Sequence, residues 1–184
     1  MTINIKNMVC PRCITAVRAI LVSMGFTVEK ITLGEAVITD SLSKEQLIVL
    51  ASHLQAEGFE LLDDPRSCLV EQIKTGVLQW VRMNSPRPKL SDYISDTVHR
   101  DYSSLSKLFS QVKGMTIEHF AILHRVEYAK ELLSYSQHSV SEIAYTLGYS
   151  SPAYMTSQFK QQTGMSPKEF REMKTKNRLH LDEI

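Results

Sequence analysis

The strongest constraint on the fold comes from the residues after Leu90, where helix-start signals follow one another and no segment alternates apolar and polar residues as a strand would. Ser139 with Glu142, and Ser166 with Glu169, have capping-box spacing, in which the two side chains satisfy free backbone N–H groups at a helix start. These signals and the apolar spacing predict an all-α half with helices at residues 90–98, 104–112, 117–133, 140–147, 152–163 and 167–174.

Two pairs of short helices flank the long helix predicted at residues 117–133. In the second pair, Gly148 suits the left-handed backbone position that ends a helix. A small core between its two helices can form from Ile143, Leu147, Met155 and Phe159. The first pair, at residues 90–112, repeats this layout. Each pair is therefore a predicted helix-turn-helix unit, a motif whose second helix enters the major groove of DNA.

An extended motif runs through residues 148–154 (GYSSPAY), 159–160 (FK) and 164–171 (GMSPKEFR). This motif resembles the signature of AraC-type transcriptional regulators, and the resemblance extends over residues 88–172. It implies a DNA-binding domain at residues 88–174, in which a long central helix holds both helix-turn-helix units. One monomer would then read two successive major-groove segments about 34 Å apart.

The same resemblance implies which residues face DNA. Base-edge contacts are expected from the second helix of each pair, at Ser103, Ser106, Lys107, Ala153, Tyr154 and Ser157. Phosphate contacts, which supply salt-dependent affinity rather than sequence information, are expected from Lys160, Lys168 and Arg171. Most of the base-edge candidates are short and uncharged, so DNA shape is expected to contribute to specificity. The alternative for each charged residue is a solvated helix face.

The first 63 residues have a different pattern, with short strands around two helices. Strands are predicted at residues 2–6, 27–32, 35–39 and 59–62, and helices at 14–24 and 43–57. Ser43 and Gln46 have capping-box spacing at the start of the second helix. The βαββαβ order predicts a ferredoxin-like sandwich of two helices on a four-stranded antiparallel sheet. The whole chain is thus predicted to be α+β, with an all-α second half.

A C-x-x-C motif, Cys10 and Cys13, lies between the first strand and the first helix. With Met8 ahead of it, the segment at residues 1–63 resembles a heavy-metal-associated domain and its M-x-C-x-x-C motif, and Gly58-Phe59 resembles the Gly-aromatic pair of that family. The resemblance implies a soft-metal site at the two cysteines. We expect Met8 to pack under the loop rather than to bind metal.

The donor set limits which metal fits. Two thiolates from one loop suit linear Cu(I), whereas Zn(II) would need two further ligands. A helix start lowers a thiol pKa, and we expect this effect at Cys13, next to Arg12. Two alternatives stay open: a thiol-disulfide switch, and a module that serves only dimerisation or partner binding. The third cysteine, Cys68, is expected to be a buried inert thiol.

Residues 64–87 are predicted to connect the two halves. Asp64-Pro65 starts a helix, because Asp is a good N-cap and Pro is tolerated at the first helical position. That helix ends before a Pro-rich stretch at residues 84–88, the best linker candidate. Residues 1–64 carry five Lys/Arg and eight Asp/Glu, and residues 65–184 carry sixteen and twelve. An acidic sensor before a basic half is predicted, with a solvated tail at residues 175–184.

These patterns together predict a cytoplasmic, sequence-specific DNA-binding regulator of transcription that responds to metal. The expected partners are double-stranded DNA, a second copy of the chain and RNA polymerase. No membrane partner is expected, because no apolar run approaches 18 residues and residues 1–6 lack the basic start of a signal peptide. No cluster of nucleophile and base can be named, so an enzyme is not predicted. The alternative is a metal-trafficking or thiol-redox protein whose helical half binds a protein partner.

Overall fold

The computed structural model of this chain describes residues 1–83, 86–135 and 137–173. The chain divides into two compact units, Met1–Thr75 and Gly76–Ile184, and the division falls within the helix α3 (Pro65–Arg82). The predicted tail at residues 175–184 lies outside the described residues, as do Lys174 of the predicted last helix and residues 84–85 of the predicted linker.

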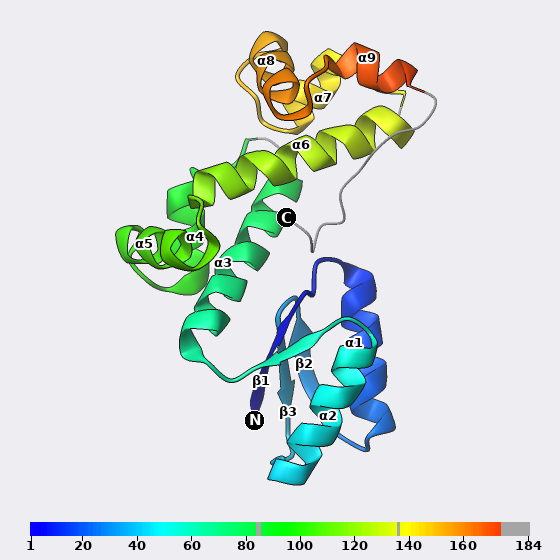
Figure 1. Cartoon of the computed structure of the whole chain (residues 1–184), viewed down its shortest axis with the longest axis vertical. Helices are drawn as coiled ribbons and strands as arrows, with labels where there is room; N and C mark the ends of the chain where they lie inside the picture. Colours follow the sequence, from blue (N-terminus) through cyan, green and yellow to red (C-terminus); the bar gives the residue numbers. More distant parts are fainter. Residues whose placement is uncertain (84–85, 136, 174–184) are drawn as a thin grey trace. The chain divides into compact units, whose positions relative to one another are not determined.

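The first unit contains four strands and two complete helices, in the order β1 (Thr2–Lys6), α1 (Pro11–Ser23), β2 (Val28–Thr32), β3 (Glu35–Ile38), α2 (Lys44–Ala56) and β4 (Glu60–Leu62). The strands form one antiparallel sheet in the order β2-β3-β1-β4. Both helices cover the same face of this sheet (Figure 1). The element order agrees with the βαββαβ order predicted from the sequence.

Alternation along the strands explains the core of this unit. Ile3 and Ile5 of β1, and Ala36 and Ile38 of β3, are buried because alternate side chains of a strand point to the same face. They meet the buried faces of α1 and α2, which contribute Val17, Leu21, Leu50 and Leu54. The capping box at the start of α2 is confirmed, since the N–H of Gln46 donates to the Ser43 hydroxyl and the N–H of Ser43 donates to the Gln46 side chain.

The start of α1 differs from the prediction. The helix begins at Pro11 rather than at Ile14, because Pro fits the first helical position and Cys10 adopts the extended backbone of an N-cap. The segment predicted as a loop is thus the first turn of the helix. Both cysteines of the C-x-x-C motif therefore belong to the helix start.

The described part of the second unit is helical, as predicted. After the last turns of α3 it contains α4 (Leu90–Val98), α5 (Tyr102–Lys113), α6 (Ile117–Tyr135), α7 (Val140–Thr146), α8 (Pro152–Thr163) and α9 (Pro167–Glu172). Both predicted capping boxes are present, at Ser139 with Glu142 and at Ser166 with Glu169.

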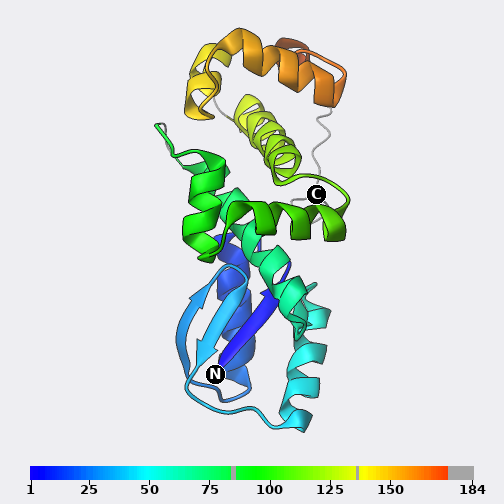
Figure 2. The ribbon, with the colours of Figure 1, turned by 90° about the vertical axis from the view of Figure 1, so that its left-hand side faces the viewer.

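Helix α6 holds this unit together. Near its start, Phe120 packs edge-on against Phe109 of α5, with ring centroids 5.4 Å apart. Further along, Val126, Ala129 and Leu133 join the buried residues of α7 and α8 in one core. The pair α4–α5 and the group α7–α9 thus lie on either side of α6 (Figure 2). No helix among the described residues is long and apolar enough to span a bilayer.

Candidate nucleic-acid interface and metal centre

The first helix-turn-helix unit is formed by α4 and α5. His99 ends α4 in the left-handed conformation, and the Asp101 carboxylate caps α5 by accepting from the N–H of Ser104 at 3.1 Å. Leu105 and Phe109 turn inward and are buried. Because these two residues lie on one face of the helix, the opposite face of α5 points outward.

Three predicted base-edge residues lie on α5. Ser103 and Lys107 are exposed, and Ser106 is half-buried. The Ser103 hydroxyl donates to the Asp101 carboxylate, so it also helps to cap the helix. The helix is anchored to α6 by the Tyr102 hydroxyl, which donates to Glu118 at 2.5 Å. Burial and this bond to a carboxylate both raise the pKa of Tyr102 far above its usual value.

The second helix-turn-helix unit is formed by α7 and α8, joined at Gly148. Gly148 has a φ of 69°, which confirms the left-handed position predicted for it. The Ser151 hydroxyl caps α8 by accepting from the N–H of Tyr154 at 3.1 Å. Met155 and Phe159 are buried, so α8, like α5, has one face in the core.

The outer face of α8 carries the remaining base-edge candidates. Ala153, Tyr154 and Ser157 are all exposed. Tyr154 keeps 54% of its surface accessible, although its ring contacts that of Tyr149 at 5.9 Å between centroids. The Tyr154 side chain therefore lies on the surface of α8 and is not part of the core. On both helices, therefore, the inward residues form the core and most of the predicted DNA-facing residues lie outward.

The three predicted phosphate contacts differ in their surroundings. Lys160, at the end of α8, and Lys168, on α9, are exposed. Arg171 is half-buried and donates to the carbonyl of His138 at 2.6 Å, which fastens α9 to the segment before α7. Its phosphate contact stays a prediction, alongside this role in positioning α9.

Arg125 of α6 is a structural residue to which the sequence analysis gave no role. Its guanidinium donates to the carbonyl of Leu147 at 2.8 Å and lies 3.9 Å from the centre of the Tyr149 ring. Burial lowers the pKa of Arg125. The residue fixes the turn between α7 and α8 to the central helix. Its place inside the region of family resemblance, residues 88–172, was the available signal.

The cysteine loop lies at the start of α1. The two sulfur atoms of Cys10 and Cys13 are 3.5 Å apart, and both residues are partly exposed. The Cys13 thiol also points to the carbonyl of Asn7, with 4.0 Å between sulfur and oxygen. Met8 is fully buried in the core of the unit, as expected. Two sulfur donors thus lie side by side at the start of α1, where both cysteines are partly exposed.

The thiol pKa values differ from the sequence prediction. Burial raises the pKa of Cys10, but the backbone N–H and thiol of Cys13, together with Arg12, outweigh it, so the net pKa is lowered. Burial, together with the neighbouring Cys10, raises the pKa of Cys13. The prediction that the helix start lowers the pKa at Cys13 is wrong, because burial and the neighbouring Cys10 thiol outweigh the backbone N–H groups that lower this pKa. Burial raises the pKa of Cys68 as well.

The donor set fits a soft ion of low coordination number. Two thiols on one loop can bind a two-coordinate soft cation such as Cu(I). Among the described residues, no group of three or more His, Cys, Asp or Glu side chains could hold a metal ion. A tetrahedral Zn(II) site would need ligands beyond this set.

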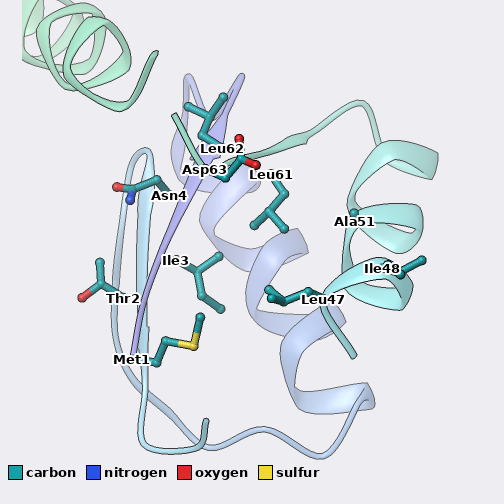
Figure 3. A pocket seen from close by; sticks show the side chains of 10 residues that line it. All are labelled: Met1, Thr2, Ile3, Asn4, Leu47, Ile48, Ala51, Leu61, Leu62 and Asp63. Carbon is teal, nitrogen blue, oxygen red and sulfur yellow. The ribbon is translucent and has the colours of Figure 1, made fainter. Parts of the chain in front are cut away.

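A groove of about 570 Å³ lies between α2 and β4, the edge strand of the sheet. The side chains of Ile3, Leu47 and Leu61 converge in it, whereas Ile48 points away from the helix into solvent (Figure 3). Ile48 is 68% exposed and its neighbour Val49 is 47% exposed. This part of α2 therefore presents more aliphatic surface than packing on the sheet requires.

The chain is similar to known proteins, and the similarity includes most of the second compact unit. Residues 94–173 match a family model described as a helix-turn-helix domain. The HTH-type transcriptional activator RhaR of Yersinia pestis (strain Angola) is 31% identical over 141 residues, which are 73% of this chain and 45% of the relative. An uncharacterized HTH-type transcriptional regulator of Staphylococcus aureus, SAS0078, is 28% identical over 131 residues, 71% of this chain and 18% of the relative. The chain thus spans less than half the length of these relatives.

A solved structure supports the same fold. This structure is the C-terminal domain of AraT, a response regulator from Geobacillus stearothermophilus. Its superposition on this protein includes 64% of this chain and 98% of the AraT domain, with a TM-score of 0.52 and 21% sequence identity. The curated relatives are regulators of transcription rather than enzymes, as the sequence predicts for this chain. Residues 94–173 therefore match a helix-turn-helix domain, and the chain is similar to HTH-type regulators of transcription over 71–73% of its length.

Proposed function

We propose that this protein is a cytoplasmic, sequence-specific DNA-binding regulator of transcription in which α5 and α8 read two segments of one duplex. The observation that carries the proposal is the presence of two helix-turn-helix units packed on α6, each with a largely polar, exposed outer face on its second helix. The printed names of the curated relatives, a transcriptional activator and a transcriptional regulator, support it.

The outward residues suit different kinds of contact. Lys107 is the long donor among the base-edge candidates and can reach guanine acceptors in the major groove. Ala153 and Ser157 are small, so they allow α8 to approach the bases closely, and Tyr154 can pack on a thymine methyl group. Lys160 and Lys168 are suited to phosphates, where they fix register and add affinity.

A selection experiment tests this proposal. The full chain is used to enrich binding duplexes from a random pool, and the affinity for the enriched duplex is measured over a series of salt concentrations. We expect one sequence with two elements about 10 base pairs apart, and a Kd that rises steeply with salt. A pool without enrichment, or salt-independent binding, would favour the alternative of a metal-trafficking protein whose helical half docks a protein partner.

We further propose that the first unit is a ferredoxin-like sensor that binds Cu(I) through Cys10 and Cys13. The βαββαβ order, the β2-β3-β1-β4 sheet and the paired sulfurs support this proposal. A bound soft cation would link the two thiolates, and loading would change affinity for the operator if it favours one state of the protein over another. Zn(II) is the second candidate, with ligands from outside the loop.

Two measurements separate the metal from its proposed effect. Metal-free protein and the double variant Cys10→Ser/Cys13→Ser are titrated with Cu(I) against a competing chelator, and the affinity for the selected duplex is then measured with and without Cu(I). We expect the double variant to lose tight Cu(I) binding and the metal effect together. Equal DNA affinities for the wild type in both states would remove metal response while leaving DNA binding intact. A thiol-redox function is tested in the same preparation by reduction of a model disulfide.

Two protein partners complete the proposal. A second copy of the chain is proposed to associate through the first compact unit, because Ile3, Leu47 and Leu61 line the groove beside β4 and the aliphatic Ile48 and Val49 are exposed on α2. RNA polymerase is proposed because a regulator of transcription can act through contact with it, whether it activates or represses. Sedimentation of the wild type and of Ile48→Glu tests the first of these, and a dimer unaffected by Ile48→Glu would place the interface elsewhere.

A further inference from the structure

The segment predicted as a linker contains a residue with an unusual set of bonds. Arg87 donates from Nη2 to the carbonyls of Met83, at 2.7 Å, and Thr146, at 2.9 Å, and from Nη1 to the carbonyl of Val81, at 3.3 Å. Val81 lies in the last turn of α3, Met83 directly follows that helix, and Thr146 is the last residue of α7. One guanidinium therefore joins the carboxyl ends of two helices within the second unit.

Helix ends explain why an arginine suits this place. The last carbonyls of a helix have no donor within the helix, and the dipole gives them partial negative charge. A planar guanidinium has five N–H groups spread over three nitrogen atoms and can serve both helix ends at once, whereas the three N–H groups of lysine all lie on one nitrogen. Burial and the nearby Arg125 lower the pKa of Arg87.

The ring of Trp80 links Arg87 to a further arginine, Arg125. Two guanidinium groups pack near the ring of Trp80 of α3: that of Arg87 lies 5.1 Å and that of Arg125 5.6 Å from the ring centre. Its indole N–H donates to the carbonyl of Pro88 at 2.9 Å, which fixes the segment that carries Arg87. The Arg125 guanidinium also packs on the ring of Tyr149, which follows the turn between α7 and α8. The Tyr149 hydroxyl donates to the buried Gln158 of α8 at 2.7 Å.

The side chain of Arg87 lies directly against the backbone of the turn at Gly148. A Cβ added at Gly148 would lie 3.1 Å from Nε of Arg87, closer than nearly all real Cβ contacts, and the φ of 69° already disfavours a side chain there. The arginine therefore packs directly on the backbone of the turn that sets where α8 begins.

We infer that Arg87 is a positioning residue for α8, the second DNA-reading helix, through the contact of its guanidinium with the turn at Thr146 and Gly148. The last turns of α3 and residues 86–88 then belong functionally to the second helix-turn-helix unit, although they precede the first one in sequence. This inference rests on the proposed DNA-binding function and adds to it a residue that the sequence assigned to a linker.

The main test compares variants on the duplex selected by the wild-type full chain, with each of its two segments scrambled in turn. Arg87→Ala and Arg87→Lys are compared with Tyr154→Ala on α8, Lys107→Ala on α5, and the nearby exposed Lys89→Ala as a control for lost charge. We expect both Arg87 variants to lose affinity about tenfold. The segment read by α8 is the one whose scrambling does not weaken binding by Tyr154→Ala any further. Scrambling this segment should not weaken binding by the Arg87 variants any further either. Scrambling the other segment should still weaken their binding.

Other patterns overturn the inference. Equal loss of recognition at both segments would mean that Arg87 only stabilises the unit, and binding like that of Lys89→Ala would mean that it does not position α8. A second readout needs no DNA: amide exchange at Gly148 and Tyr149, whose N–H groups bond to Tyr145 and Ala144, should speed up in Arg87→Ala, while that of α5 should not. Unchanged exchange overturns the inference, whereas failure of the wild type to bind DNA removes only the proposed function.

Discussion

The backbone N–H of Asn7 donates to Oε1 of Glu71 at 3.2 Å, which joins the residue after β1 to the first half of α3. Glu71 is buried, and its other oxygen accepts from Lys74 at 2.9 Å, with each of these side chains only 7% exposed. Asn7 itself has a positive φ of 71° and donates from its side chain to the carbonyl of Gly58 at 3.0 Å. These bonds explain why the first turns of α3 belong to the compact unit that contains the cysteine loop.

Replacing Glu71 by Ala should therefore destabilise the first unit strongly. The change leaves the Lys74 ammonium buried without its carboxylate and removes the acceptor of the Asn7 N–H. A loss of about 3 kcal/mol in the free energy of unfolding is expected. Amide exchange of the β1 strand in the full chain reports it, because this strand lies in the middle of the sheet. The exposed pair of Lys6 and Glu60 supplies the control, and Glu60→Ala should cost less than about 1 kcal/mol. Equal costs would contradict the argument.

Local signals made most of the fold predictable. Serine caps, alternation in β1 and the position of Gly148 each depend on a few neighbouring residues, and the structure confirms them. The start of α1 was missed, because apolar spacing begins at Ile14 while the helix begins at Pro11. The outward positions of Ser103, Lys107, Tyr154 and Ser157 were implied by the family resemblance, and all four side chains are exposed.

Contacts between distant segments were not predictable in this way. Arg87 lies between two prolines, a composition typical of a linker, and the carbonyl of Thr146 that it binds is 59 residues away. The same holds for Glu71, whose partner Asn7 is 64 residues earlier in the chain. Neither pairing leaves a periodic mark on the sequence, because each depends on how helices pack and not on their spacing. For Cys10 and Cys13, the motif was visible, but the assignment of the lowered pKa required the burial and the neighbouring groups of each thiol.

Cys10 should be the most reactive thiol of this protein. Alkylation requires the thiolate, and the lowered pKa of Cys10 gives it a larger thiolate fraction at neutral pH than Cys13 or Cys68, whose pKa values are raised. As pH rises, the rate at Cys10 should reach half its maximum first. Iodoacetamide labelling of the metal-free reduced protein, followed by peptide mass spectrometry, measures the order. Faster labelling of Cys13 would contradict this order of the two pKa values.

The substitution Ser139→Ala should destabilise the second helix-turn-helix unit. The Ser139 hydroxyl accepts from the N–H of Glu142 at 3.2 Å, and the Glu142 carboxylate accepts from the N–H of Ser139 at 2.6 Å. Loss of an N-cap side chain costs about 1 kcal/mol. Amide exchange of α7 in the full chain measures this cost. Ser141→Ala, an exposed change two residues later in the same helix, is the matched control and should leave the exchange within about 0.5 kcal/mol of the wild type.

Lys168→Ala and Tyr154→Ala should weaken DNA binding in two distinguishable ways. Lys168 is exposed on α9 and is assigned to a phosphate, so its loss should lower affinity for all duplexes alike and reduce the salt slope by about one. Tyr154 carries no charge and faces outward from α8, so its loss should leave the slope unchanged and weaken only the selected sequence, by about 1 to 3 kcal/mol. Titrations of both variants on the selected duplex and on a scrambled duplex, each at four salt concentrations, separate the two effects. A reduced slope for Tyr154→Ala, or sequence-dependent loss for Lys168→Ala, would show that the two residues have been assigned to the wrong parts of the DNA.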